Sequence, residues 1–323
     1  SAIYRKKNNG DRIEKLDNLQ NESIAIVEDS ADFLINRYTL HRLISTRYLA
    51  MVLKQSASEK IEKTILLAGG INYDYLPKTV VAKDTAKKSI LRNEEINGSF
   101  SYLEGSKDEV ENIGKILKQN EWLITLLENG DASEENILNF ENDNSRGILH
   151  IATHGFSFPE QIEYLDSNRL RLRGFRYRNN PDPMQRCGLI LSGANWALKS
   201  NYEETKDSLL TEDGILTAAQ VALMNLKKTK VVVLSACETG LGKIEDAEGV
   251  LGLMRAFKLA GVDQVIVSLW KVPDQETMEM MTYFYEELAK SQNAIVAFEK
   301  AQKKMCKYYP TRPDLWAGFV LIR

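Results

Sequence analysis

Residues 230–237 read Lys-Val-Val-Val-Leu-Ser-Ala-Cys and form the clearest strand pattern in the chain. A short continuous apolar run is typical of a strand buried on both faces of a parallel sheet. Cys237 follows this run, at the predicted carboxyl end of the strand. Because open α/β sheets place their function just outside the carboxyl ends of the strands, this stretch indicates both the fold class and where to look for a site.

Similar patterns continue outward from this segment in both directions. Further strands are predicted at 64–70, 122–127, 147–152, 188–191, 264–269 and 316–322. Helices are predicted at 106–117, 133–140, 217–224, 248–260, 274–290 and 293–307. Strands that alternate with helices predict an α/β fold, a three-layer sandwich with a mainly parallel central sheet flanked by helices. Ser106 and Glu109 have the spacing of a capping box at the start of their helix.

The chain is expected to divide near residue 60. Residues 1–60 are interpreted as an N-terminal extension, a partial lead-in to the α/β domain at 61–323. Within it, 1–23 is polar and predicted to be a loop or frayed end, whereas 31–55 fits either a strand followed by a helix or two helices. Since the chain lacks an initiator Met, we expect a fragment or a processed form.

Composition narrows the function classes. The 323 residues include 42 Lys and Arg against 45 Asp and Glu, so the net charge of −3 argues against nucleic acid as a direct partner. No apolar run reaches the roughly 18 residues of a membrane span, and the first residues lack a signal peptide. Three cysteines do not make a disulfide framework, which favours a reducing, cytoplasmic location.

Two reactive residues stand at predicted strand ends, His154 and Cys237. A Cys–His pair is a nucleophile with its base, because the imidazole takes the thiol proton and the thiolate attacks a carbonyl carbon. Gly155 and Gly240 lie beside them and allow sharp turns. The amides of Gly155 and Cys237 are candidates for an oxyanion hole. The alternative is a small buried cysteine and a strand-end histidine without chemistry.

Other site classes find little support. His150 precedes His154 by four residues, but on a strand and without the Glu of a zinc protease helix, so no metal is predicted. The segment Gly240-Leu-Gly-Lys243 departs from a phosphate-binding loop at Cys237 and Ile244. There is no Gly-x-Ser-x-Gly nucleophile elbow. We therefore expect no cofactor.

Three segments together resemble the CHAT family of caspase-like proteases, within the clan of caspases and separase. They are His150-Ile-Ala-Thr-His154-Gly155, Leu234-Ser-Ala-Cys237-Glu-Thr-Gly240-Leu-Gly242 and Ser268-Leu-Trp270-Lys-Val-Pro-Asp274. The resemblance implies a cysteine endopeptidase acting on a protein substrate, with His154 as base and Cys237 as nucleophile. It also implies the Gly155 and Cys237 amides as oxyanion hole. Family members are often joined to tetratricopeptide (TPR) repeats, so an upstream TPR or sensor module is expected outside this chain.

Specificity is expected to come from an acidic residue. Asp274 is placed like the acidic residue that receives an arginine before the scissile bond in separase-like members, and a carboxylate binds guanidinium bidentately. Its alternative role is to cap a helix that begins at Gln275. Asp213 and Glu238 are secondary candidates for substrate binding, and each also fits a solvated surface charge. The arginine-rich insertion at 156–187 is either a solvated basic loop or a self-cleavage segment.

Two rival functions stay open. A pseudo-protease would keep the fold and bind partner proteins without turnover. An acyltransferase would use the same thiolate and pass the acyl group to an amine. The resemblance also implies, for bacterial members, a role in antiviral defence or regulated cell death.

Overall fold

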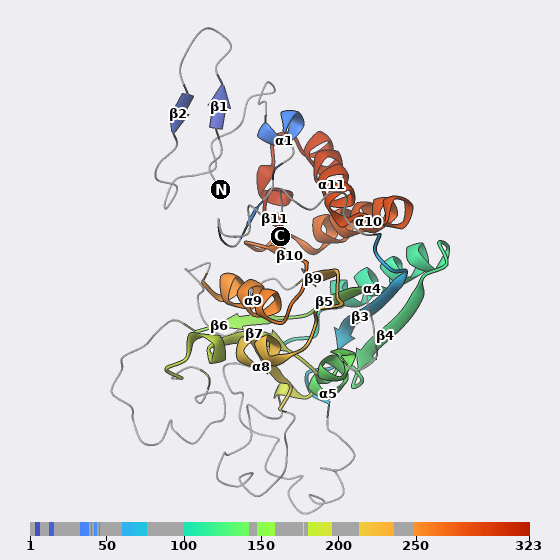
Figure 1. Cartoon of the computed structure of the whole chain (residues 1–323), viewed down its shortest axis with the longest axis vertical. Coiled ribbons are helices and arrows are strands. Elements are labelled where there is room, and N and C mark those ends of the chain that lie inside the picture. The colour runs from blue at the N-terminus through green and yellow to red at the C-terminus, as the bar shows by residue number, and fades with distance from the viewer. Residues whose placement is uncertain are drawn as a thin grey trace, which may run out of the picture.

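The computed structural model describes residues 33–38, 40, 42–43, 45, 60–75, 100–140, 147–158, 177, 180–195, 213–235 and 249–323, together with the backbone of 4–6, 13–15, 141 and 248. A six-stranded sheet with the order β11-β10-β9-β5-β3-β4 lies at its centre (Figure 1). Its strands are β3 (Thr64–Ile71), β4 (Leu123–Asn129), β5 (Ile148–Ala152), β9 (Val231–Ser235), β10 (Gln264–Ser268) and β11 (Phe319–Ile322). All neighbours are parallel except β10 and β11. The predicted mainly parallel sheet is confirmed.

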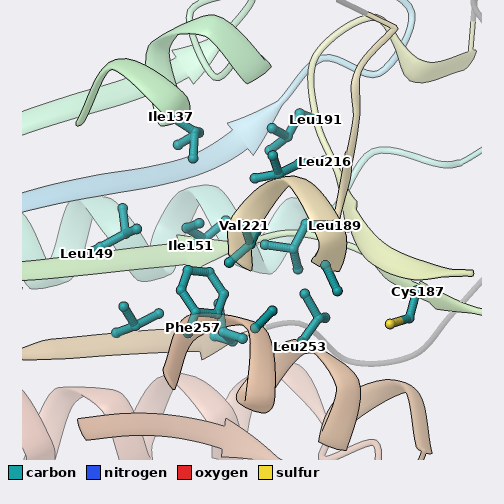
Figure 2. Packing of buried hydrophobic residues seen from close by; sticks show 14 of the residues in the cluster. Ile137, Leu149, Ile151, Cys187, Leu189, Leu191, Leu216, Val221, Leu253 and Phe257 are labelled. Carbon is teal, nitrogen blue, oxygen red and sulfur yellow. The ribbon is translucent and has the colours of Figure 1, made fainter. Parts of the chain in front are cut away.

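Helices cover both faces of this sheet. Helices α4 (Glu104–Lys118), α10 (Asp274–Ser291) and α11 (Ala294–Tyr308) share one apolar cluster with Ile65 and Leu67 of β3. Helices α5 (Glu134–Leu138), α8 (Ala218–Leu223) and α9 (Glu248–Leu259) share the other cluster with Leu66 and Ala68. Alternate residues of one strand thus face opposite helix layers, as the strand period of two requires. Figure 2 shows the second cluster, in which Phe257 of α9 packs near β5.

A second, three-stranded antiparallel sheet lies beside the carboxyl end of β5. It consists of β6 (Gly155–Ser157), β7 (Cys187–Ile190) and β8 (Ile215–Thr217), in that order. Only the middle strand was predicted from the sequence, at 188–191. The two outer strands have three residues each, too few to show a period, so their formation depends on pairing with β7.

The predicted start of the helix at Ser106 and its predicted capping box are both wrong. Helix α4 begins at Glu104 after Leu103, without a side-chain cap, so the capping box of Ser106 and Glu109 does not form. The Ser106 hydroxyl donates instead to the Leu103 carbonyl and accepts from the amide of Gly70. Ser106 and Glu109 are both buried on the helix face that meets the sheet, where tertiary partners compete successfully with the local cap.

The described parts of the N-terminal segment contain short elements. Strands β1 (Tyr4–Lys6) and β2 (Ile13–Lys15) pair antiparallel, so the prediction of a loop or frayed end fails at these residues. Helix α1 (Leu34–Arg37) falls within 31–55. Single-turn 3-10 helices occupy Asn139–Glu141, Pro183–Gln185 and Pro313–Leu315. No helix among the residues placed here has the length and hydrophobicity to cross a membrane.

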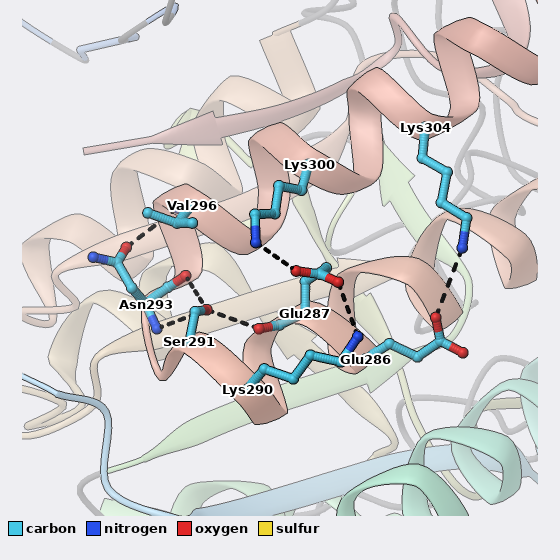
Figure 3. Close-up of polar contacts among 8 residues, drawn as sticks. All are labelled: Glu286, Glu287, Lys290, Ser291, Asn293, Val296, Lys300 and Lys304. Atoms are coloured by element: carbon cyan, nitrogen blue, oxygen red, sulfur yellow. Dashed lines mark hydrogen bonds and ion pairs between the residues drawn. The ribbon is translucent and has the colours of Figure 1, made fainter.

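Helices α10 and α11 form a hairpin, shown in Figure 3. Gln292 ends α10 in the left-handed conformation, with φ of 50°, and the Asn293 side chain accepts from two amides of α11. Glu287 pairs with Lys290 on the same helix and with Lys300 across the hairpin. Exposed ion pairs of this kind contribute little, about 0–1 kcal/mol each. Burial of side chains such as Met280 and Phe284 therefore dominates the packing of this layer.

Candidate active site

The carboxyl ends of β5 and β9 lie side by side in the middle of the central sheet. Ala152 is paired with Ser235, and the Thr153 amide donates to the Ser235 carbonyl at 3.2 Å. His154 follows two residues after Ala152. Cys237 follows two residues after Ser235 along the chain and lies outside the described residues.

His154 is held by a backbone carbonyl. Its Nε2 lies 2.8 Å from the oxygen of Ser101, an exposed residue in the segment that leads into α4. A carbonyl oxygen only accepts, so Nε2 carries the hydrogen, and the lone pair of the neutral ring is on Nδ1. From the sequence alone, no third residue for the Cys–His pair is evident. Nothing in the sequence marks Ser101, because its contribution is a main-chain atom.

The surroundings of His154 favour the neutral form of its imidazole. Burial lowers the pKa of His154 below its usual value; the Ser101 carbonyl opposes this shift, and the nearby charge of Lys271 adds to it. The rings of Tyr73 and Phe100 lie with centroids 5.1 and 5.3 Å from the imidazole. A neutral ring with a lone pair is the form in which histidine acts as a general base.

The amide of Gly155 points away from β7. In the antiparallel pair β6–β7, the Ile190 amide donates to His154 and the Phe158 amide donates to Arg186. Hydrogen-bonded and non-hydrogen-bonded pairs alternate along such a ladder, so the intervening Gly155–Leu189 pair is non-hydrogen-bonded. The Gly155 N–H is therefore not used by β7, as an oxyanion-hole donor requires.

The other two cysteines are buried and poorly reactive. Cys187 on β7 is 3% exposed, and burial, together with the charge of Asp182, raises its pKa to about 11. Burial also raises the pKa of Cys306 on α11. Because the thiolate is the nucleophile, both thiols are weak candidates at neutral pH.

Asp274 is exposed and is the first residue of α10. Pro273 occupies the N-cap position and no side chain caps the helix, so the N-cap alternative for Asp274 is wrong. Its side chain lies against Gly105 in the first turn of α4, where an added Cβ would meet the Asp274 carboxylate at 3.1 Å. Gly105 is four residues after Ser101, and Lys271, which influences His154, is three residues before Asp274.

Asp213 anchors its own loop. Its carboxylate accepts from the Ile215 amide and from the Tyr177 hydroxyl, the described contact of the 156–187 insertion with this loop. The amides of Asp213 and Gly214 both donate to Glu134. Burial and the neighbouring Asp213 charge raise the pKa of Glu134 to about 8. The other secondary candidate, Glu238, and Gly240 lie outside the described residues.

His150 belongs to a buried polar cluster behind the site. The ring is 0% exposed; Nδ1 lies 3.0 Å from the Tyr285 hydroxyl, and Nε2 lies 3.1 Å from Glu109 Oε1. Glu109 also accepts from the Ser235 hydroxyl at 2.9 Å. Within the described ranges, no three His, Cys, Asp or Glu side chains are grouped as metal ligands.

Comparisons with known proteins place the chain in a family. Residues 17–323 match the CHAT domain. Two curated relatives are tetratricopeptide repeat protein 28 of Homo sapiens and of Mus musculus, 36% and 34% identical over 125 residues, which is 38% of this chain. The chain spans only about 5% of the length of these relatives.

Solved structures with a similar arrangement include gingipain R, an Arg-specific cysteine proteinase, with a TM-score of 0.43, 10% identity and coverage of 81% of this chain and 46% of that one. A complex of the pro- and mature domains of Porphyromonas gingivalis RgpB gives a TM-score of 0.40 and 10% identity, covering 81% and 48%. The resemblance predicted from the three sequence segments is confirmed by the match that covers most of the chain. The chain belongs to the CHAT domain family.

Proposed function

We propose that this CHAT domain is a cysteine endopeptidase with Cys237 as nucleophile and His154 as base. The register of β5 and β9 carries the proposal, because Ala152 is paired with Ser235 and each candidate residue follows two positions later. Adjacent strands lie about 4.8 Å apart, so this register favours contact between the two side chains. The neutral His154 with a lone pair on Nδ1 supports its role as base.

The reaction then has two halves. His154 Nδ1 takes the thiol proton of Cys237, and the thiolate attacks the scissile carbonyl carbon. The amides of Gly155 and Cys237 bind the oxyanion, and collapse of the tetrahedral intermediate releases the amine, which takes the proton from His154. Water, deprotonated by His154, attacks the acyl-enzyme, and the thiol leaves as the carboxylic product forms. Apart from water, residues of this chain supply every catalytic group in these reaction steps.

A labelling and cleavage experiment tests the dyad. The whole protein should cleave sites in a random peptide pool, and Cys237→Ala and His154→Ala should abolish this cleavage. Iodoacetamide should modify Cys237 faster than the buried Cys187 and Cys306, with a rate that falls in His154→Ala. Cleavage that persists in Cys237→Ala would refute the proposal. Absence of cleavage together with His154-independent labelling would favour the pseudo-protease.

For specificity, we propose that Asp274 receives an arginine side chain before the scissile bond. Its exposed carboxylate, in the loop-to-helix turn after β10, supports this, whereas Asp213 already binds protein donors. Asp274→Asn should reduce cleavage after arginine without changing iodoacetamide labelling of Cys237. Glu276→Gln, in the same turn of α10, is the matched control. An unchanged preference in Asp274→Asn would exclude this pocket.

Self-processing and the setting of the protein belong to the same proposal. Fragments of the wild type cut after arginines of the 156–187 insertion, and absent from Cys237→Ala, would establish self-cleavage. The two relatives named tetratricopeptide repeat protein 28 support the presence of a TPR module elsewhere in the whole protein. A role in defence or cell death is supported by family resemblance alone, and identification of the cleaved protein would test it.

A further inference from the structure

Asn195 clamps the backbone that holds the candidate base. Its Oδ1 accepts from the Phe100 amide at 2.7 Å, and its Nδ2 donates to the Phe100 carbonyl at 2.8 Å. One side chain thus binds both main-chain polar groups of one residue, as a neighbouring β-strand would. The amide orientation is unambiguous, because an N–H only donates and a carbonyl only accepts. The next residue, Ser101, supplies the carbonyl that holds His154.

Asn195 also holds the backbone of Tyr73, the second aromatic residue packed against the imidazole. The backbone N–H of Asn195 donates to the Tyr73 carbonyl at 3.0 Å. The Tyr73 hydroxyl lies 3.0 Å from Thr153 Oγ1, next to His154. The rings of Tyr73 and Phe100 both pack within 5.3 Å of the His154 ring, measured between centroids. Asn195 is therefore bonded to both residues whose rings enclose the imidazole.

Asn195 is itself rigidly placed. It is 1% exposed and lies in the segment that follows β7. In that segment, the Ser192 and Gly193 amides donate to the carbonyls of Ala132 and Asn72. A buried side-chain amide that both donates and accepts a hydrogen bond, on a segment that is itself hydrogen-bonded to its neighbours, is held rigidly. The Ser101 carbonyl consequently stands at a defined place although its own side chain is exposed.

We propose that Asn195 is a positioning residue for the dyad, acting through Phe100 and Ser101 on the tautomer and orientation of His154. The inference rests on the proposed function only for its effect on turnover. Its direct effect is on the imidazole: without the clamp, the Ser101 carbonyl moves, Nε2–H loses a fixed acceptor, and the ring samples both tautomers. A displacement of about 1 Å in such a group lowers turnover by up to about 100-fold.

The direct test reads the ring by NMR. Long-range ¹H–¹⁵N spectra of the whole protein, in a Cys237→Ala background, report the tautomer and pKa of His154, assigned by its loss in His154→Ala. The original chain should show the Nε2–H tautomer, and Asn195→Ala should show a tautomer mixture with a His154 pKa further below the usual histidine value, because the hydrogen bond to Ser101 raises that pKa. Asn112→Ala, which removes a side-chain amide bonded to Thr282 on α10, should leave the ring unchanged.

Activity provides the second reading. If the protein cleaves peptides, Asn195→Ala should lower kcat about 10- to 100-fold with little change in KM. Should Asn195→Ala fail to fold, Asn195→Asp, which keeps the acceptor for the Phe100 amide and loses the donor, must shift the same signals. A folded Asn195→Ala or Asn195→Asp with the original tautomer and pKa would overturn the inference. Cleavage that survives Cys237→Ala would instead overturn the proposed function, while the NMR outcome would still decide the role of Asn195.

Discussion

Replacing Glu109 with alanine should lower the free energy of unfolding by about 1–3 kcal/mol for each buried polar partner that it leaves without an acceptor. Glu109 is 4% exposed and His150 is 0% exposed. The carboxylate lies 3.1 Å from His150 Nε2 and accepts the Ser235 hydroxyl at 2.9 Å. Removing this carboxylate leaves the buried His150 ring and the half-buried Ser235 hydroxyl without the acceptor that it provided. The cost then includes their uncompensated desolvation, in addition to the lost contacts.

Single substitutions at its partners apportion this cost. Ser235→Ala removes one hydrogen bond to a carboxylate, for an expected loss of about 1.5–3 kcal/mol. Tyr285→Phe removes only the hydroxyl contact to His150, for about 0.5–1.5 kcal/mol. Because Glu109 contacts Ser235 directly, the loss of unfolding free energy in the double variant Glu109→Ala/Ser235→Ala should differ from the sum of the two single losses by about 0.5–3 kcal/mol.

Urea unfolding followed by circular dichroism measures these differences as shifts of the midpoint at constant m-value. Glu111→Ala is the matched control on α4. That side chain is 38% exposed and pairs with Lys107 and Lys115 at the surface, so the expected change is at most about 1 kcal/mol. If Glu109→Ala costs no more than Glu111→Ala, the account of the buried cluster is refuted.

Three shorter predictions test other parts of the molecule. The pKa of Glu134 is raised from 4.5 to about 8, so the native state binds this proton more tightly than the unfolded state does. The free energy of unfolding should therefore fall as the pH rises from about 4.5 through about 8. Urea unfolding at a series of pH values should show a flatter slope for Glu134→Gln. Lys271→Met should raise the pKa of His154 and move the acidic limb of Cys237 alkylation to higher pH; an unmoved limb would contradict it. Gly69→Ala should displace α4 and slow alkylation, since an added Cβ would lie 2.6 Å from a carbonyl oxygen of α4, whereas Gly114→Ala, with 3.8 Å to its nearest neighbour, should not; equal rates would contradict this.

The central sheet could be predicted because each of its strands carries its own signal. The run at 231–235 is apolar on both faces, and both faces are covered. The register that brings Ala152 opposite Ser235 could not be predicted, since it depends on pairing between distant strands. The same limit applies to Glu109, whose spacing from Ser106 fits a local cap but whose carboxylate finds Ser235 across the fold.

Main-chain partners set a second limit on prediction. Ser101 holds His154, and Phe100 binds the Asn195 side chain, through backbone atoms, and no side-chain pattern reports where a carbonyl will point. Asn195 lies in a segment without helical or strand periodicity, so its double hydrogen bond has no sequence signature. The two residue types of the candidate pair were predictable from chemistry, whereas the groups that hold His154 were found only in the folded chain.

Helix α4 and the segment that leads into it contact His154 and Ser235. The segment that leads into it holds His154 through the Ser101 carbonyl, and Glu109 within it holds Ser235 near the end of the strand that leads toward Cys237. Gly69 lets this helix approach β3 more closely than any side chain would allow. A shift of α4 therefore changes the support of the candidate base and of the strand that leads toward the candidate nucleophile together. Because interiors are densely packed, such a shift is transmitted rather than absorbed.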